Sequence, residues 1–438
     1  MKKYASQTRP RSALPAVGGT AWALSQYAPR ALALLGLCTC GSRALCFEAK
    51  DIFAVSAGPV VFHPKFSASA GYNDNIYYLP SDLALDDYVF VLSPGINVRL
   101  GRPDADNRVD LDYRFDQLLY AQNDRADASD HSITLSGGAK GARLSYDTRN
   151  SFQFLDSIVN GYTATIEGIP VPAGNVERHY FDLDHSLGYD LTAKGRLLLE
   201  GAFHWREYPS GQRLLFLPYY DSNEWRGTAG YSHALSEKTR LAGRFYYGQF
   251  AQNPNGEFGI YALKPPHADY TGGTVEANGR FTSKLSGNVR AGYEYRWFSG
   301  DAESDGYPVA GIGLREQFTE KTSASLNYNR GGSVSAYPGA GAGSQVRVNP
   351  TVTDSVTFNV QQVLGTRHPW FLNLGLTYAR SEYVNTSDAY DNFQVEIGAN
   401  YQLRSWAVAF LTYAHEFGNR QTYDYDVNRV NIGFSLGL

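Results

Sequence analysis

The chain reads Val-Asp-Leu-Asp-Tyr-Arg-Phe-Asp from Val109 to Asp116. Successive side chains of a β-strand point to opposite faces, so this stretch would carry its apolar residues on one face and its charged residues on the other. The same alternation ends the sequence, where the apolar positions are Val430, Ile432, Phe434, Leu436 and Leu438. Strands of this kind predict a sheet with one apolar and one polar surface.

The composition supports an all-β chain. The 438 residues include 44 Gly, 32 Tyr and 23 Phe beside a single Met. Aromatic and β-branched residues that alternate with polar ones favour strands, whereas a helical bundle would draw on Ala, Leu, Glu, Lys and Met. After the N-terminal segment, no run of 18 or more apolar residues occurs, which excludes a helical membrane protein.

Alternating segments recur along the whole chain. They begin near Val61, Tyr88, Arg108, Ala128, Ala142, Arg178, Arg196, Asn223, Thr239, Ala268, Leu285, Tyr307, Thr322, Gln345, Val356, Trp370, Asn392 and Asp426, with a further one near Trp406. We expect the segments on either side of Pro350 to merge into one strand. Pro94 is a local conflict, because proline removes a donor from the hydrogen-bond ladder. The pattern therefore predicts eighteen strands, with sixteen as the alternative.

The connections between these segments alternate in length. Short polar turns are expected at 192–194, 236–238, 282–284, 319–321 and around 404–405. Long stretches rich in Pro, Gly, Asn and Asp lie between them, at 73–86, 156–177, 207–221, 252–267, 331–344 and 380–391. Short turns at one end and long loops at the other, joining strands longer than the about 9–11 residues that cross a bilayer, indicate a transmembrane antiparallel β-barrel with periplasmic turns and extracellular loops.

A soluble β-sandwich is the alternative fold. Its strands would run to about 5–6 residues, and its polar face would not be expected to carry isolated Arg, Asp and Glu opposite rows of Tyr and Trp. The greater strand length and the charged polar face both favour the barrel. This interpretation assigns residues 60–438 to the barrel and leaves residues 47–59 as a short periplasmic arm.

Residues 1–46 have the features of a secretory signal peptide. Basic residues precede an apolar run at 31–40, and Ala44 and Cys46 offer small side chains at the −3 and −1 positions of a cleavage site. The alternatives are a transmembrane anchor, which needs about 20 apolar residues, and a lipid anchor on Cys40. All three cysteines, at 38, 40 and 46, lie within this segment, so the exported chain would have no disulfide and no thiolate metal site.

The predicted signal peptide also alters the charge balance. Removal of its six basic residues leaves 33 basic against 43 acidic residues, a balance of −10. This balance gives no reason to expect a nucleic-acid partner. The expected surroundings are the lipid of a Gram-negative outer membrane and the machinery that inserts barrels there. The oligomeric state cannot be read from the strands, because subunit and lipid contacts are both apolar.

Three motifs near the start of the barrel carry a family resemblance. They are Gly-Tyr-Asn-Asp-Asn-Ile-Tyr at 71–77, Ser-Pro-Gly-Ile at 93–96 and Leu-Asp-Tyr at 111–113. With them the sequence resembles the beta-barrel porin 2 family of bacterial outer membranes. The resemblance implies the location and the fold. It also suggests a link to exopolysaccharide export, because many members of the family lie beside genes for that process. The alternating C-terminal strand is similar to the insertion signal of outer-membrane barrels, although it ends on Leu438 where an aromatic residue is usual.

The polar strand face would line a lumen, because sixteen to eighteen strands leave room for an aqueous channel. Its charged candidates are Asp110, Asp112, Arg114, Asp182, Asp184, Glu200, Arg206, Arg240, Arg244, Arg290, Glu294, Arg296 and Glu396. Their mixed signs predict weak ion selectivity, with solute size as the main filter. The alternative is that they pair with one another as a structural wall.

Other candidate sites are weaker. Tyr247, Tyr295, Trp297 and Tyr401 are expected at the lipid interface rather than as sugar-stacking platforms. Asp74 and the acidic loop at 81–87 lack the spacing of a calcium site, which favours simple solvation. His179 and His185 lack a carboxylate at metal spacing, so no metal site and no cofactor is expected. No G-x-S-x-G motif occurs, and nothing predicts an enzyme.

The function expected from the sequence is therefore an outer-membrane channel for hydrophilic solutes. The alternatives are an outer-membrane component of exopolysaccharide export and a structural or adhesive surface barrel. An inward fold of 156–177 or 331–344 would favour a small-solute channel, whereas an open lumen of one dominant charge sign would favour polymer export.

Overall fold

The computed structural model describes most of the barrel region. The described residues are 53–101, 105–158, 162–166, 169–172, 175–209, 221–253, 267–298, 304–337, 347–366, 369–383, 389–420 and 423–437. The predicted signal peptide, residues 47–52 of the predicted arm and Leu438 lie outside them.

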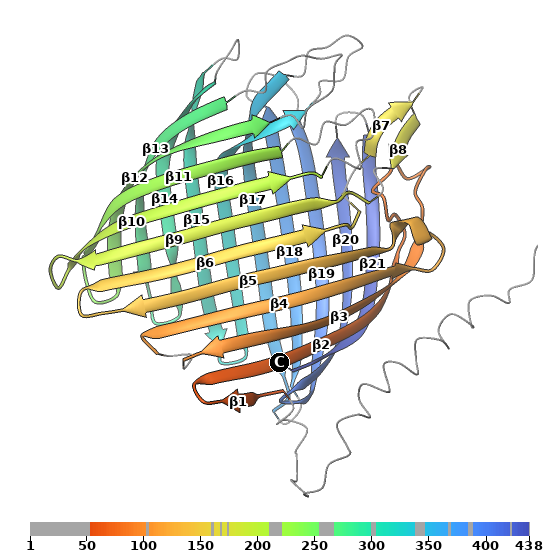
Figure 1. The fold of residues 1–438 in the computed structure, drawn as a ribbon, viewed down its shortest axis with the longest axis horizontal. Coiled ribbons are helices and arrows are strands. Elements are labelled where there is room, and N and C mark those ends of the chain that lie inside the picture. Colours follow the sequence, from red (N-terminus) through yellow and green to blue (C-terminus); the bar gives the residue numbers. More distant parts are fainter. Residues whose placement is uncertain are drawn as a thin grey trace, which may run out of the picture. The chain divides into compact units, whose positions relative to one another are not determined.

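Eighteen long strands form one closed antiparallel sheet (Figure 1). They are β2 (Val60–Asn73), β3 (Asp87–Leu100), β4 (Asn107–Tyr120), β5 (Ala128–Lys140), β6 (Leu144–Leu155), β9 (Arg178–Asp190), β10 (Gly195–Glu207), β11 (Asp221–Ala234), β12 (Thr239–Asn253), β13 (His267–Arg280), β14 (Leu285–Phe298), β15 (Asp305–Thr319), β16 (Thr322–Tyr337), β17 (Arg347–Leu364), β18 (Trp370–Tyr383), β19 (Ala389–Arg404), β20 (Ala407–Arg420) and β21 (Tyr423–Leu436). The predicted eighteen-stranded barrel is confirmed, and the alternative of sixteen strands is wrong.

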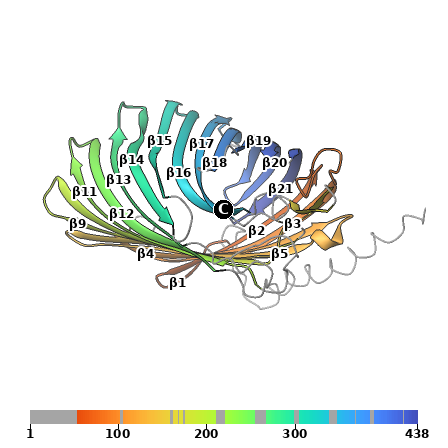
Figure 2. The same ribbon diagram turned by 90° about the horizontal axis from the view of Figure 1, so that it is seen from above.

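The barrel closes where its first strand meets its last. β2 pairs with β21 from Phe66↔Leu436 to Asn73↔Arg429, while its other edge pairs with β3 along its whole length. Seen from above, the strands follow one another around the wall in chain order until β21 lies beside β2 (Figure 2). Closure leaves no unpaired barrel edge, which is what allows a sheet to stand in hydrocarbon.

The strands are long enough to cross a bilayer. The barrel strands run from 12 residues in β6 to 18 in β17, against the about 9–11 residues that a tilted transmembrane strand needs. In the described part of the chain, no helix is both long and apolar enough to span a membrane.

The two prolines singled out from the sequence, Pro94 and Pro350, both lie within strands. The segments on either side of Pro350 form the single strand β17, as predicted. Pro94 lies within β3, where the pairing with β4 is interrupted at Ser93 and Pro94 and then resumes in the same register. The Ser93 hydroxyl donates a hydrogen bond to Asp116 at this interruption.

The short turns share one chemical device. Thr192 Oγ1 accepts a hydrogen bond from Gly195 N at 2.8 Å, and Thr282 Oγ1 accepts one from Leu285 N at 2.9 Å. Ser236 Oγ accepts from Thr239 N at 3.1 Å in the same way. A hydroxyl that satisfies the backbone of a tight turn explains why Ser or Thr recurs there.

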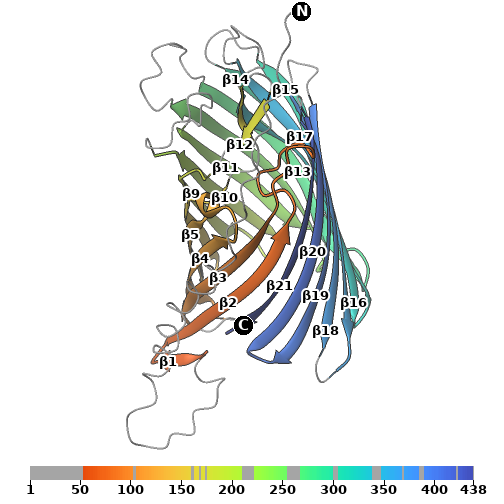
Figure 3. The ribbon, with the colours of Figure 1, turned by 90° about the vertical axis from the view of Figure 1, so that its right-hand side faces the viewer.

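Smaller elements lie at the two ends of the barrel. β1 (Val55–Ala57), which falls in the predicted arm, pairs with the start of β2 at the turn end of the barrel (Figure 3). At the loop end, β7 (Tyr162–Ile166) and β8 (Ile169–Pro172) form a separate hairpin, and Asp124–Ala126 forms a 3-10 helix. The sequence pattern did not predict either of these two elements.

The two faces of the sheet differ as the alternation predicts. Residues opposite one another in an antiparallel pair share a face, so the pairing sorts every position as inner or outer. The outer positions expose large apolar side chains, among them Phe245 and Ile432 at 61% and Leu199 at 56%. A continuous apolar exterior of this size is typical of a surface that lipid covers.

Candidate functional site

The lumenal wall is the candidate site, and the pairing places all the charged candidates on it. The inner positions include Asp110, Asp112, Arg114, Asp182, Asp184, Glu200, Arg206, Arg240, Arg244, Arg290, Glu294, Arg296 and Glu396. Their neighbours along each strand face outward. What distinguishes these side chains from one another is their partners.

Ion pairs connect β2, β3 and β4 on the inner face. Arg99 Nε lies 2.6 Å from Asp110 Oδ1, and Lys65 Nζ lies 2.5 Å from Asp112 Oδ2. Arg114 pairs within its own strand, with 2.7 Å between its Nε and Asp116 Oδ1. The charges of these strands are therefore matched locally.

The same matching continues over β9 to β13. Asp182 Oδ1 accepts from His204 Nδ1 and from Arg206 Nη2, both at 2.7 Å. Arg244 pairs with Glu276 and lies 3.6 Å from Glu200 Oε1. Pairs of this kind hold neighbouring strands together and leave little net charge facing the lumen. We call the inner faces of β2–β4 and β9–β14 the paired-charge wall.

The most buried part of this wall is a cluster around Glu294. Glu294 is 7% exposed and Arg296 4%, and Arg296 Nε donates to Glu294 Oε1 at 2.6 Å. The hydroxyl of Tyr246 donates to Glu294 Oε2 at 2.9 Å, and that of Tyr307 donates to Oε1. The Arg296 guanidinium also lies over the Tyr270 ring, 4.6 Å from its centroid. The carboxylate and the guanidinium are thus satisfied by each other and by aromatic neighbours.

Three of the charged candidates differ from the rest. Asp184, Arg240 and Glu396 have no hydrogen-bond or ion-pair partner within the described ranges. Arg290 donates to the neutral side chain of Asn329, at 3.0 Å. Most of the thirteen positions therefore belong to a wall of ion pairs. Such a structural wall was one of the two interpretations of the sequence pattern.

The β16–β17 hairpin bends onto the inner wall near its loop end. β16 pairs with β15 only as far as Arg330 but stays paired with β17 beyond that residue. Arg296 Nη2 donates to the Gly332 carbonyl at 3.1 Å, and Val352 packs with Tyr307 in a buried cluster. A side chain at position 332 would collide with the Tyr307 ring, so glycine permits this close approach. This part of 331–344 narrows the lumen; residues 338–346 lie outside the described ranges.

A second segment, the loop at 74–86, folds across the closing seam. Asn75 is fully buried; its Nδ2 donates to the Leu79 carbonyl at 2.6 Å and to the Asp426 carbonyl at 3.1 Å, and its Oδ1 accepts from Leu79 N at 2.9 Å. Asp74 accepts from the backbone and side chain of Asn428, at 2.7 and 2.8 Å. The motif at 71–77 therefore fastens this loop to β21.

Inner-face side chains complete that attachment. Arg429 Nη1 donates to the Tyr78 hydroxyl at 2.7 Å, and its Nη2 donates to Glu416 Oε2 at 2.9 Å. Tyr78 packs with Tyr425 and Val427, both inner residues of β21. The loop thus lies against the lumenal side of the seam, a position that no periodicity of the sequence indicates.

The expectation that the acidic residues of this region are simply solvated is wrong for two of them. Asp74 is engaged with Asn428, as described above. Asp87 is fully buried and accepts hydrogen bonds from the backbone of Tyr88, Ala121, Gln122 and Asn123 and from the Asn123 side chain, at 2.7 to 3.2 Å. It fixes the β4–β5 loop. Asp82 and Asp86 are exposed, and Asp86 Oδ2 also accepts a hydrogen bond from the Tyr72 hydroxyl at 3.1 Å.

A second region of the wall was not predicted, because only charged residues were taken from the sequence as lumenal candidates. The inner face of β16–β19, which we call the amide wall, carries amide and hydroxyl side chains: Ser323, Ser325, Asn327, Asn329, Ser355, Thr357, Asn359, Gln361, Asn373, Thr377, Asn392, Gln394, Asn400 and Gln402. On this face over residues 323–329, 351–361, 371–381 and 390–402, Glu396 is the single charged side chain. The signal was present as an alternation of neutral polar and apolar residues.

The aromatic residues expected at the lipid interface all occupy outer positions. Tyr247 lies close to Trp225 and Trp297, with centroids 5.5 and 6.3 Å apart, towards the loop end. Towards the turn end, the Tyr401 ring packs against Trp370 in a tilted arrangement, with centroids 4.7 Å apart. Two aromatic bands at opposite ends of an apolar surface match the girdles of membrane barrels.

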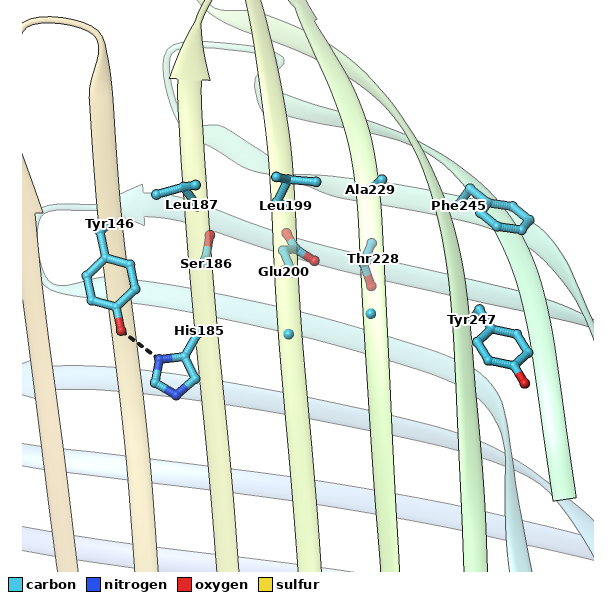
Figure 4. A pocket seen from close by; sticks show the side chains of 12 residues that line it. Tyr146, His185, Ser186, Leu187, Leu199, Glu200, Thr228, Ala229, Phe245 and Tyr247 are labelled. Carbon is cyan, nitrogen blue, oxygen red and sulfur yellow. Dashed lines mark hydrogen bonds between the residues drawn. The ribbon is translucent and has the colours of Figure 1, made fainter. Parts of the chain in front are cut away.

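One surface depression lies on this outer face. It encloses about 490 Å³ and is lined by apolar side chains such as Leu187, Leu199 and Phe245 (Figure 4). Gly201 and Gly227 form part of its floor, and Tyr146 Oη lies 2.7 Å from His185 Nδ1 at its edge. The depression faces away from the lumen and is not part of the candidate site.

Two further expectations concern specific residue sets. Val430, Ile432 and Phe434 of the expected insertion signal are exposed on the outer face, and their reading by insertion machinery stays a prediction. In the parts of the chain that the structure describes, no group of three His, Cys, Asp or Glu side chains is arranged to hold a metal ion.

Three solved structures that are similar to this chain have low sequence identity and TM-scores below 0.5. No family model matches the sequence, and no curated protein matches it significantly; membership of the beta-barrel porin 2 family therefore stays a prediction. Among solved structures, OccAB3 of Acinetobacter baumannii is 13% identical, over 86% of this chain and 99% of that one, with a TM-score of 0.41. The outer membrane protein OpdK of Pseudomonas aeruginosa is 9% identical, over 85% and 98%, with a TM-score of 0.43. A bacterial polysaccharide outer membrane secretin is 9% identical, over 85% and 97%, with a TM-score of 0.34. At these values the fold assignment rests on the strand pairing itself.

Proposed function

We propose that the protein is a channel of the Gram-negative outer membrane that passes small hydrophilic solutes. The observation that carries this proposal is the closed eighteen-stranded barrel with an apolar exterior and a polar interior. A barrel of this strand number is too wide for its own side chains to fill, and its interior is typically aqueous. The proposed partners are outer-membrane lipid and the insertion machinery.

Two features favour small solutes over polymer export. The β16–β17 hairpin and the loop at 74–86 both lie on the inner wall and reduce the open cross-section of the lumen. The lumenal charges are of both signs and mostly paired, instead of the single dominant sign expected for the transport of a charged polymer. The same pairing supports weak ion selectivity.

Exopolysaccharide export and a structural or adhesive role are the competing functions. An export component would admit long glycans, and a structural barrel would conduct nothing. Neither needs a catalytic site, and the proposal includes none.

The test is the electrical conductance of the refolded barrel, residues 47–438, in a planar bilayer, with liposome swelling as a second readout. Heat-modifiable electrophoretic migration and a β-type circular dichroism spectrum establish that the protein is folded. We expect steady open-channel current in KCl and swelling with small sugars that falls as solute size rises. Absence of both from folded, inserted protein would overturn the channel function, and equal passage of long polysaccharides would support export instead.

A further inference from the structure

The amide wall has hydrogen-bonding capacity that the protein itself does not use. Asn359 and Gln361 of β17, Asn373 of β18 and Gln394 of β19 have no side-chain hydrogen bond to any described residue. Asn327, Asn359 and Gln361 are also solvent-exposed. Each amide offers both donors and acceptors, so this face can bind a solute that presents both.

The paired-charge wall offers much less. Asp110, Asp182 and Glu276 already accept from cationic neighbours, and Glu294 accepts from three side chains. A solute that bound there would have to displace charge-assisted hydrogen bonds, which are stronger than neutral ones. Solute contacts should therefore concentrate on β16–β19.

A groove of about 440 Å³ crosses this part of the wall, from β15 to β19. Its lining includes Ser325, Asn359, Gln361, Asn373 and Gln394. Its volume lies within the range of about 300–1,000 Å³ that is usual for small-molecule sites.

The groove has one charge at each side and none between. Arg315 lines it on β15 and Glu396 on β19, and four strand spacings of about 4.8 Å separate these strands by roughly 19 Å. A single small ion pair or zwitterion cannot reach both. The floor between them fits an uncharged molecule that presents many hydroxyl groups along some 15–20 Å.

We infer that this groove binds a short neutral oligosaccharide, lying across β16–β19 and held by the side-chain amides of Asn359, Gln361, Asn373 and Gln394. The inference rests on the proposed channel function and names the solute class that the channel favours. Hydroxyl groups exchange water for amide partners without the cost of stripping a charge of its hydration.

The test compares two pairs of amides at matched depth. Gln361 lies opposite Asn373 near the turn end of β17–β18, and Asn278 lies opposite Asn288 near the turn end of β13–β14. The test variant is Gln361→Ala/Asn373→Ala, and the control is Asn278→Ala/Asn288→Ala in the paired-charge wall. Single-channel current is recorded in KCl alone and with added maltotriose, trigalacturonate or the cationic glucosamine trimer.

We expect maltotriose to interrupt the wild-type current more often and for longer than either charged trimer. The amide-wall variant should shorten the maltotriose blocks about 25-fold, since it removes two amides and each neutral hydrogen bond is worth a factor of roughly five. The control variant should leave them unchanged, and both variants should keep the salt conductance. Channels that conduct KCl but are not blocked by maltotriose, or are blocked better by a charged trimer, would overturn the inference while the channel function stands. Folded protein with no current at all would overturn both.

Discussion

The paired-charge wall and the amide wall face the same lumen but are built on different chemistry. In the first, carboxylates lie 2.5 to 2.7 Å from the ammonium or guanidinium groups of Lys and Arg. In the second, the neutral amides of Asn359, Gln361, Asn373 and Gln394 have no hydrogen-bond partner among the described residues. The charges of a barrel interior need not be its solute contacts: where they are paired they join strands, and the less conspicuous neutral residues are left for the solute.

The largest effect should come from the centre of the paired-charge wall. Glu294→Ala leaves the guanidinium of Arg296, which is 4% exposed, buried without its carboxylate partner. Breaking a buried pair in this way lowers the free energy of unfolding by about 3–5 kcal/mol. The measurement is the free energy of unfolding in urea with the barrel in lipid vesicles. Glu396→Ala is the control: its side chain is exposed and has no described partner, so a change within about 0.5 kcal/mol is expected. Equal losses of unfolding free energy in the two variants would show that paired and unpaired lumenal charges contribute equally to stability.

The attachment of the loop at 74–86 should give the next largest effect. Asn75→Ala removes a buried side chain that bonds to Leu79 and Asp426, and the unsatisfied backbone groups should cost about 1–3 kcal/mol. Tyr77 and Tyr78, both buried, should then become accessible, which faster chymotrypsin cleavage of the folded barrel would report. Asn359→Ala serves as the control, because Asn359 is exposed and unpaired. A cleavage rate unchanged by Asn75→Ala would show that the loop is held by other contacts.

A smaller effect is expected where a pair of the same wall is exposed. The Arg114 side chain is 59% exposed although its Nε lies 2.7 Å from Asp116, and exposed pairs contribute about 0–1 kcal/mol. Arg114→Gln should therefore change the unfolding free energy by less than about 1 kcal/mol. A loss as large as that of Glu294→Ala would mean that pairing, independent of burial, stabilises the wall.

The smallest effect concerns ion selectivity. Glu396 is an unpaired charge on the amide wall, so Glu396→Gln should shift the reversal potential in a KCl gradient towards anions. One screened charge contributes on the order of 0.5 kcal/mol, or about a twofold change in the permeability ratio. Lys65→Met/Asp112→Asn, which removes a matched pair, should leave the ratio unchanged. A larger shift from the matched pair would place the selectivity on the other wall.

Most of the fold could be predicted from the sequence, because alternation, turn chemistry and strand length are local properties. Even the merger around Pro350 followed from them. The loop at 74–86 could not be predicted in this way: Asn75 contacts Asp426, 351 residues away, and periodicity carries no information on such contacts. The sequence singled out 156–177 and 331–344 instead; the start of the second contacts the inner wall through Gly332, and Ile158 of the first packs against the buried cluster of the loop at 74–86.

The site was predictable in part. Alternation sorts side chains between two faces, which is why the thirteen charged candidates share the inner one. It does not show which charges pair: Arg244 of β12, for example, meets Glu276 on the adjacent β13 and Glu200 on β10, two strands away. The amide wall was overlooked because Asn373 or Gln394 alone does not stand out; it becomes a feature only when four strands are brought side by side.

The central claim is that the amide wall faces an open, water-filled lumen, and one measurement tests it directly. All cysteines of the sequence lie at 38, 40 and 46, so a barrel refolded from residue 47 is free of thiols. Asn359→Cys places a thiol on the amide wall, and Val360→Cys places one on the outer face of the same strand. A charged, membrane-impermeant thiosulfonate is added while single-channel current is recorded. We predict a stepwise fall in current for Asn359→Cys and none for Val360→Cys; reaction at 360 with none at 359 would contradict the account.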